Sequence, residues 1–109
     1  PYARIMTMHP LIETHRAALD ELCRRYHVRR LELFGSVATG TFKPESSDID
    51  FLVEFDPDSA GRAFDDYFGL HEELERLFGR KVDLVCTGAL RNPFFIKDVN
   101  QSRRLLYAA

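Results

Sequence analysis

The sequence predicts an α/β domain in which helices pack against one small sheet. The chain has 109 residues, the size of one ordinary domain, and 45% of them are hydrophobic, which is typical of a protein with a packed core. Along the chain, segments in which apolar residues recur at helical spacing alternate with short β-branched and aromatic runs. We therefore expect a single domain over residues 1–109.

The N-terminal half predicts a helix and two strands. Apolar side chains recur every three or four residues from Leu11 to Tyr26, as on one face of a helix, and the preceding proline suits its first turn. Residues 31–34 alternate in polarity and stop at a glycine, as a strand does. A loop rich in Gly, Thr, Pro and Ser follows over residues 35–47. Residues 49–55 are mostly β-branched or aromatic and form the second expected strand.

The C-terminal half continues the alternation. Residues 56–61 are expected to be a connection, and residues 62–78 a helix that Gly79 ends. A third strand is expected over 81–85, a last helix over 93–101 with Thr87 or Asn92 near its start, and an extended segment over 105–107. One stripe of the 62–78 helix is expected to be core: Phe64, Tyr67, Phe68, His71, Leu74 and Phe78.

Composition argues against several classes of protein. The longest apolar runs last only a few residues, too few for a membrane span, and no secretory signal is expected. Cys23 and Cys86 lie far apart in segments expected to be buried, so we expect free thiols and a cytoplasmic protein. The net charge is −2 and the pI about 6.1, without the broad basic face of a nucleic-acid-coating protein.

The most acidic stretch carries the most informative motif. Residues 35–58 hold one lysine against six acidic side chains. Asp48 and Asp50 are two apart at the head of a strand, so both carboxylates should point the same way. Such a pair needs a proton or a cation, which makes a divalent metal the first expectation. Asp83 could join them if its strand lies beside theirs, and three carboxylates can hold two metal ions.

Gly35 and Ser36 supply the other half of the expected site. A glycine after a strand permits a tight turn, and the Ser36 hydroxyl and following backbone amides can hold a phosphate. Together the residues describe a nucleoside triphosphate held between Gly35-Ser36 and metal on the aspartates. Each piece alone has a simpler structural explanation, as a common turn, a solvated loop or a hydrogen-bonded aspartate. Their order and spacing together favour the site.

These residues resemble the signature of the DNA polymerase β-type nucleotidyltransferase superfamily, with a motif core over about 31–86. More narrowly, the chain from about Ile12 to Tyr107 resembles the superfamily's minimal single-domain prokaryotic members, the MNT proteins. The resemblance implies the nucleotidyltransferase fold, a mixed sheet flanked by helices, and transfer of a nucleoside monophosphate with release of pyrophosphate. The likeness is carried by Gly35-Ser36, Ser47-Asp48-Ile49-Asp50, Gly79-Arg80-Lys81-Val82-Asp83-Leu84-Val85, Leu90-Arg91-Asn92-Pro93 and Leu106-Tyr107-Ala108-Ala109.

The resemblance also implies a role for each site residue. Asp48 and Asp50 would ligate two Mg²⁺ ions and bridge them to the triphosphate of ATP. Asp83 would complete the metal that lowers the pKa of the attacking hydroxyl, and Gly35 and Ser36 would bind phosphate. Catalysis would then consist mostly of positioning and charge neutralisation.

MNT proteins are commonly encoded beside HEPN-domain RNase toxins. The resemblance therefore implies an antitoxin of a type VII-like pair that transfers AMP from ATP to a tyrosine of a HEPN partner in a hetero-oligomer. Two alternatives stay open: an antitoxin that only covers its partner's active site, and a transferase acting on a small molecule or RNA 3′ ends. Thr39 stands where many members carry an arginine, and Lys43, Arg29 or Arg30 could supply that charge.

Overall fold

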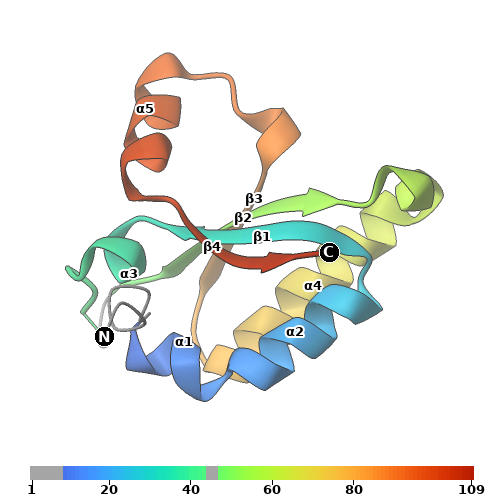
Figure 1. Ribbon diagram of the computed structural model, residues 1–109, viewed down its shortest axis with the longest axis horizontal. Coiled ribbons are helices and arrows are strands. Elements are labelled where there is room, and N and C mark those ends of the chain that lie inside the picture. The colour runs from blue at the N-terminus through green and yellow to red at the C-terminus, as the bar shows by residue number, and fades with distance from the viewer. Residues whose placement is uncertain (1–8, 44–46) are drawn as a thin grey trace.

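A four-stranded mixed sheet forms the centre of the computed structural model, which describes residues 9–43 and 47–109. The strands lie in the order β3-β2-β1-β4, with β1 antiparallel to β2 and β4, and β2 parallel to β3. Helices cover both faces (Figure 1), so the predicted α/β fold is confirmed. The strand bounds are Val28–Phe34 for β1, Ile49–Phe55 for β2, Val82–Cys86 for β3 and Arg104–Ala108 for β4.

The predicted N-terminal helix is divided in two. Helix α1 runs over Pro10–Thr14 and α2 over Arg16–Arg25, with the proline in the first turn as expected. The backbone at His15 leaves the helical region, with φ −106° and ψ 16°. The His15 ring donates a hydrogen bond from Nδ1 to the carbonyl of Leu11, 2.8 Å away, so this side chain competes with the helical backbone for a carbonyl.

The main core lies between the sheet and helices α2 and α4, the latter over Ala63–Phe78. Phe51 and Phe78 pack there with their ring centres 6.0 Å apart. The prediction of a core stripe along α4 was wrong for its first turns, because Phe64 is 74% and Phe68 53% exposed. A helix of 16 residues is about 24 Å long, whereas the five-residue β3 beside it spans about 17 Å, so the start of α4 extends past the strand.

A smaller apolar cluster occupies the opposite face of the sheet, where Phe34, Leu52 and Val99 are buried together. Val99 belongs to α5, over Pro93–Ser102, and the Asn92 side chain caps this helix by accepting a hydrogen bond from Phe94 N at 2.9 Å. Asn92 rather than Thr87 therefore begins the last helix, while residues Thr87–Ala89 form a short 3-10 turn. A short helix, α3 over Ser36–Thr39, lies within the expected loop, and Pro57–Arg62 forms another 3-10 turn.

Two further sequence expectations can be compared with the structure. Cys23 is buried and Cys86 partly buried, and both are free thiols as predicted. Burial raises the pKa of Cys23 to about 12, which keeps it an unreactive thiol. Within residues 9–43 and 47–109, the structure has no helix with the length and apolar character that a membrane span requires.

Candidate active site

Two of the predicted metal ligands lie side by side on neighbouring strands. Asp50 in β2 and Asp83 in β3 are partners in the parallel register, which places their side chains next to each other on one face of the sheet. Both alternate with core residues, which directs them to the face of the sheet that α5 covers. Burial, followed by the Asp83 and Asp48 carboxylates, raises the pKa of Asp50 to about 6. The pair therefore holds a shared proton or requires a cation.

Asp48 lies at the same end of β2 but has a different neighbour. Lys81 Nζ is 3.9 Å from Asp48 Oδ2, and the Lys81 carbonyl accepts a hydrogen bond from Ile49 N at 3.3 Å. Over residues 9–43 and 47–109, no three His, Cys, Asp or Glu side chains form a ready group of metal ligands. The structure thus brings Asp50 and Asp83 together and leaves Asp48 beside them, paired with a lysine.

The donor set fits Mg²⁺ in the form that this ion takes with nucleotides. Mg²⁺ uses one or two protein carboxylates and takes its other ligands from phosphate oxygens and water. The Asp50–Asp83 pair supplies two such carboxylates, and Asp48 offers a third within the same end of the sheet. Two carboxylates this close repel each other, and a divalent cation between them removes that repulsion.

Gly35 brings the loop after β1 against Asp50. Its backbone has φ 72° and ψ −151°, a region essentially restricted to glycine. A Cβ atom at this position would lie 2.2 Å from Asp50 Oδ2. Ser36 follows and begins α3, and its carbonyl accepts hydrogen bonds from the N–H groups of Gly40 and Thr41. The predicted pairing of the Gly-Ser turn with the aspartates is therefore present in the geometry.

The structure also shows which cations lie near this site. Arg30, in the first half of β1, bonds Glu32 at 3.3 Å, and along an extended strand it lies about 17 Å from Gly35. Arg29 is one residue further away, so neither arginine supplies the charge that Thr39 lacks, and the role of Lys43, the third candidate, stays a prediction. Lys81, which the sequence analysis missed, lies against Asp48 instead. Its position directly before the strand that carries Asp83 is the signal that could have identified it.

Other residues missed in the sequence belong to the contacts between α5 and β1. The Arg103 guanidinium donates hydrogen bonds to both carboxylate oxygens of Glu32. Glu32 is 3% exposed, and the Arg103 hydrogen bond lowers the pKa of its carboxyl. Ser102 Oγ accepts a hydrogen bond from Gly35 N at 3.0 Å. The last residues of α5 are therefore fastened to the strand that leads into the Gly-Ser turn.

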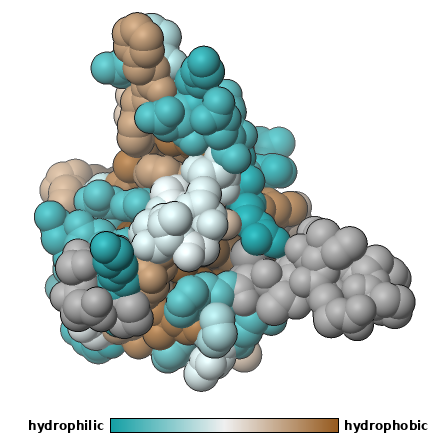
Figure 2. Space-filling view, turned by 90° about the vertical axis from the view of Figure 1, so that its left-hand side faces the viewer, coloured by the Kyte–Doolittle hydropathy of each residue, from teal (hydrophilic) through white to brown (hydrophobic). Residues whose placement is uncertain are grey.

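An aromatic surface lies beside the same face of the sheet. The Phe95 ring meets Phe34 edge-on at 5.8 Å between ring centres. Phe94 is 80% and Phe95 39% exposed, both in the first turn of α5. Figure 2 shows apolar surface at the top of the molecule, where Figure 1 places α5. A large partner approaching Asp50 and Asp83 on this face would meet these rings.

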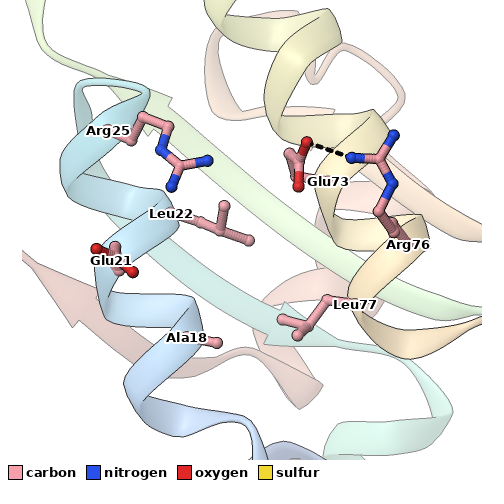
Figure 3. A pocket seen from close by; sticks show the side chains of 7 residues that line it. All are labelled: Ala18, Glu21, Leu22, Arg25, Glu73, Arg76 and Leu77. Carbon is pink, nitrogen blue, oxygen red and sulfur yellow. Dashed lines mark hydrogen bonds and ion pairs between the residues drawn. The ribbon is translucent and has the colours of Figure 1, made fainter.

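A separate groove of about 390 Å³ lies between α2 and α4 (Figure 3). Its floor is apolar, with Leu22 and Leu77, and its rim is charged, with Arg25 from α2 and the Arg76–Glu73 ion pair from α4, 2.7 Å between atoms. Helices α2 and α4 pack on the sheet face opposite to Asp50 and Asp83. The groove therefore has no part in the candidate active site.

Comparison with known proteins finds matches over most of the chain. The model of the nucleotidyltransferase domain family matches residues 15–106. Protein adenylyltransferase MntA of Thermococcus cleftensis is 35% identical over 88 residues, covering 81% of this chain and 85% of that protein. A solved structure described as a candidate minimal nucleotidyltransferase has a TM-score of 0.70 and 35% identity, covering 85% of this chain and 90% of that one.

The fold is also shared with solved toxin–antitoxin complexes. One neighbour is a structure of the tri-AMPylated HEPN toxin of Shewanella oneidensis in complex with an MNT antitoxin. It aligns with a TM-score of 0.58 at 18% identity, covering 89% of this chain and 72% of that chain. At this identity the likeness concerns the fold.

Proposed function

This chain belongs to the nucleotidyltransferase domain family as a minimal nucleotidyltransferase, and we propose that it transfers AMP from ATP to a tyrosine hydroxyl of a HEPN-domain toxin. In this proposal the chain is the antitoxin of the pair and acts in the cytoplasm. The observation that carries the proposal is the pairing of Asp50 and Asp83 on neighbouring strands, with Gly35 directly against the Asp50 carboxylate. The relative named protein adenylyltransferase MntA supports AMP as the group transferred.

The proposal gives each site residue a role. Asp48, Asp50 and Asp83 hold Mg²⁺, for which we expect two ions, and Gly35 with Ser36 holds the phosphates of ATP. The metal supplies charge neutralisation of the triphosphate and lowers the pKa of the attacking hydroxyl. Lys81, whose Nζ is 3.9 Å from Asp48 Oδ2, is the cation that we assign to the outer phosphates, in place of the charge missing at Thr39.

The reaction is an in-line displacement at the α-phosphorus of ATP. The tyrosine oxygen forms a bond to phosphorus, the bond from phosphorus to the α,β-bridging oxygen breaks, and pyrophosphate leaves with that electron pair. The tyrosine proton passes to a carboxylate oxygen of Asp83, whose exposed position on the edge strand β3 leaves it accessible to an acceptor. Asp50, the more buried of the two, would remain a metal ligand throughout.

The surface around the site favours a protein acceptor over a small molecule. Phe94 and Phe95 expose two aromatic rings beside the catalytic face, and such rings are the typical anchors of protein interfaces. A HEPN toxin is the acceptor class found with an MNT antitoxin in the AMPylated complex that shares this fold. The alternative is an antitoxin that acts only by covering its partner. It would use the same surface and would not need the aspartates.

Intact-protein mass spectrometry tests the proposal. The chain is incubated with ATP, Mg²⁺ and a HEPN-domain protein encoded beside it, and we expect the HEPN protein to gain one or more adenylyl groups, each the mass of AMP less one water. Peptide fragmentation should place them on tyrosine. Asp50→Asn and Asp83→Asn should abolish the gain, and a chelator should do the same. A stable complex that silences the toxin without any mass gain would contradict AMP transfer and support covering alone.

A further inference from the structure

The end of α5 is tied to the turn that precedes α3. Gly35 donates its backbone N–H to Ser102 Oγ over 3.0 Å, a contact between residues 67 positions apart in the sequence. The Ser102 hydroxyl in turn donates to the carbonyl of Asp98, 3.2 Å away within α5. The hydroxyl thus accepts from the turn and donates to the helix at the same time, which fixes its orientation.

The backbone at Gly35 is tightly constrained beside Asp50. Gly35 occupies a backbone region essentially limited to glycine, and its Cα faces the Asp50 carboxylate so closely that a Cβ would meet Oδ2 at 2.2 Å. A displacement of the Gly35 backbone would therefore move Ser36 relative to Asp50. The hydrogen bond from Gly35 N is the contact across to α5 that opposes such a displacement.

Neighbouring contacts make α5 a firm support for this bond. Val99 is buried against Phe34, the residue before Gly35, and Arg103 is bonded to Glu32 two residues earlier. These contacts hold α5 along β1 without touching the turn itself. Ser102 alone, among these α5 residues, contacts the backbone of Gly35.

We infer that Ser102 is a positioning residue, which holds the backbone of Gly35 so that Gly35-Ser36 and Asp50 form one preorganised site for Mg²⁺-bound ATP. This inference rests on the proposed function for the identity of the ligand. Ser102 touches neither the nucleotide nor the acceptor in this role and acts through Gly35. Loss of its hydroxyl loosens the turn and weakens nucleotide binding, whereas the fold is retained.

Two variants separate positioning from general packing. Ser102→Ala removes the hydroxyl, and Ser102→Thr keeps it. We expect Ser102→Ala to raise the dissociation constant of Mg²⁺-bound, non-hydrolysable ATP analogue about three- to tenfold, the range that one ordinary hydrogen bond corresponds to. Ser102→Thr should restore binding to within twofold of wild type. Ser59→Ala, which removes an exposed loop hydroxyl bonded to Asp56 O, is the matched control and should bind like wild type.

A second control tests whether any weakening of α5 has the same effect. Val99→Ala removes buried packing but leaves the Ser102 hydroxyl, so it should lower the melting temperature more than Ser102→Ala but lower nucleotide affinity less than Ser102→Ala does. Hydrogen exchange gives a readout that needs no ligand. The Gly35 amide should exchange about tenfold faster in Ser102→Ala than in wild type, because its acceptor is gone, and Ser102→Thr should restore the protection.

The outcomes distinguish this inference from the proposed function. A wild-type chain that binds no nucleotide would overturn both the proposed function and a role of Ser102 in nucleotide binding. If the wild-type chain binds nucleotide and Ser102→Ala binds it equally well, only the positioning role of Ser102 is overturned. An equal loss in Ser102→Ala and Ser102→Thr, or in Val99→Ala, would also overturn it, since packing rather than the hydroxyl would then be responsible.

Discussion

Gly35→Ala is the substitution whose consequence follows most directly from the geometry. The added Cβ would lie 2.2 Å from Asp50 Oδ2 and 3.2 Å from Asp50 Cγ, so the carboxylate must move. Alanine would also have to adopt φ 72° with ψ −151°, which costs about 1–3 kcal/mol. Forcing atoms into occupied space adds about 1–3 kcal/mol more. We expect the free energy of unfolding to fall by about 2–6 kcal/mol and nucleotide transfer to be lost.

A double-mutant cycle separates the two costs. Asp50→Ala removes the atoms that the new Cβ would strike, so Gly35→Ala in that background should cost only the backbone strain, about 1–3 kcal/mol. The two substitutions should therefore be coupled by about 1–3 kcal/mol. Asp50→Ala alone should not destabilise the metal-free protein much, because it relieves the crowding with Asp83.

Urea unfolding of the wild type, the two single variants and the double variant measures the coupling. Gly88→Ala is the control. A Cβ at Gly88 meets no atom within 4 Å, and its φ lies outside the region that only glycine favours, so this control should leave stability nearly unchanged. The reasoning is refuted if Gly35→Ala costs the same free energy with and without the Asp50 carboxylate. In that case the close approach of Gly35 to Asp50 would have no energetic consequence.

Three further substitutions test other parts of the account. Glu32→Gln should make the free energy of unfolding depend less on pH between 3 and 7. The Arg103 hydrogen bond lowers the pKa of Glu32, so the ionised carboxylate stabilises the fold by about 2 kcal/mol above its ordinary pKa near 4.5, and this stabilisation is lost as the pH falls below that value. Unfolding measured at several pH values between 3 and 7 checks this. Lys81→Met should leave the free energy of unfolding within about 0.5 kcal/mol of wild type, because the Lys81 side chain is exposed. It should raise the ATP dissociation constant several-fold in calorimetry, because the proposal gives its ammonium to the phosphates. Phe94→Ala should weaken acceptor binding about tenfold with stability unchanged, whereas Phe64→Ala on the other face of the sheet should leave the acceptor's dissociation constant unchanged.

The regular elements could be predicted because local pattern determines them. The strand over 49–55 has the predicted bounds, and Gly79 ends α4 in the left-handed conformation with φ 63°. Asp50 and Asp83 were placed on neighbouring strands conditionally, and the parallel pairing of β2 with β3 fulfils that condition. Their roles as metal ligands, and those of Asp48, Gly35 and Ser36, remain predictions.

The residues that could not be predicted depend on long-range contacts. Ser102 and Arg103 meet β1 only because α5 folds back across the sheet, and nothing in their local sequence specifies Gly35 or Glu32 as partners. The exposure of Phe64 follows from the length of α4 relative to its strand, which periodicity alone does not encode. A helical stripe predicts the face that a residue occupies, but the neighbour on that face is a property of the fold.

The most direct test of AMP transfer follows the phosphates of ATP separately. The chain and the HEPN-domain protein proposed as its partner are incubated with Mg²⁺ and ATP labelled at either the α- or the γ-phosphate, and label on the HEPN protein is counted. The account predicts stable incorporation from α-labelled ATP, none from γ-labelled ATP, and loss of incorporation in Asp50→Asn and Asp83→Asn. Incorporation from the γ-label, or α-label incorporation that persists in both variants, would contradict the central role of the Asp50–Asp83 pair.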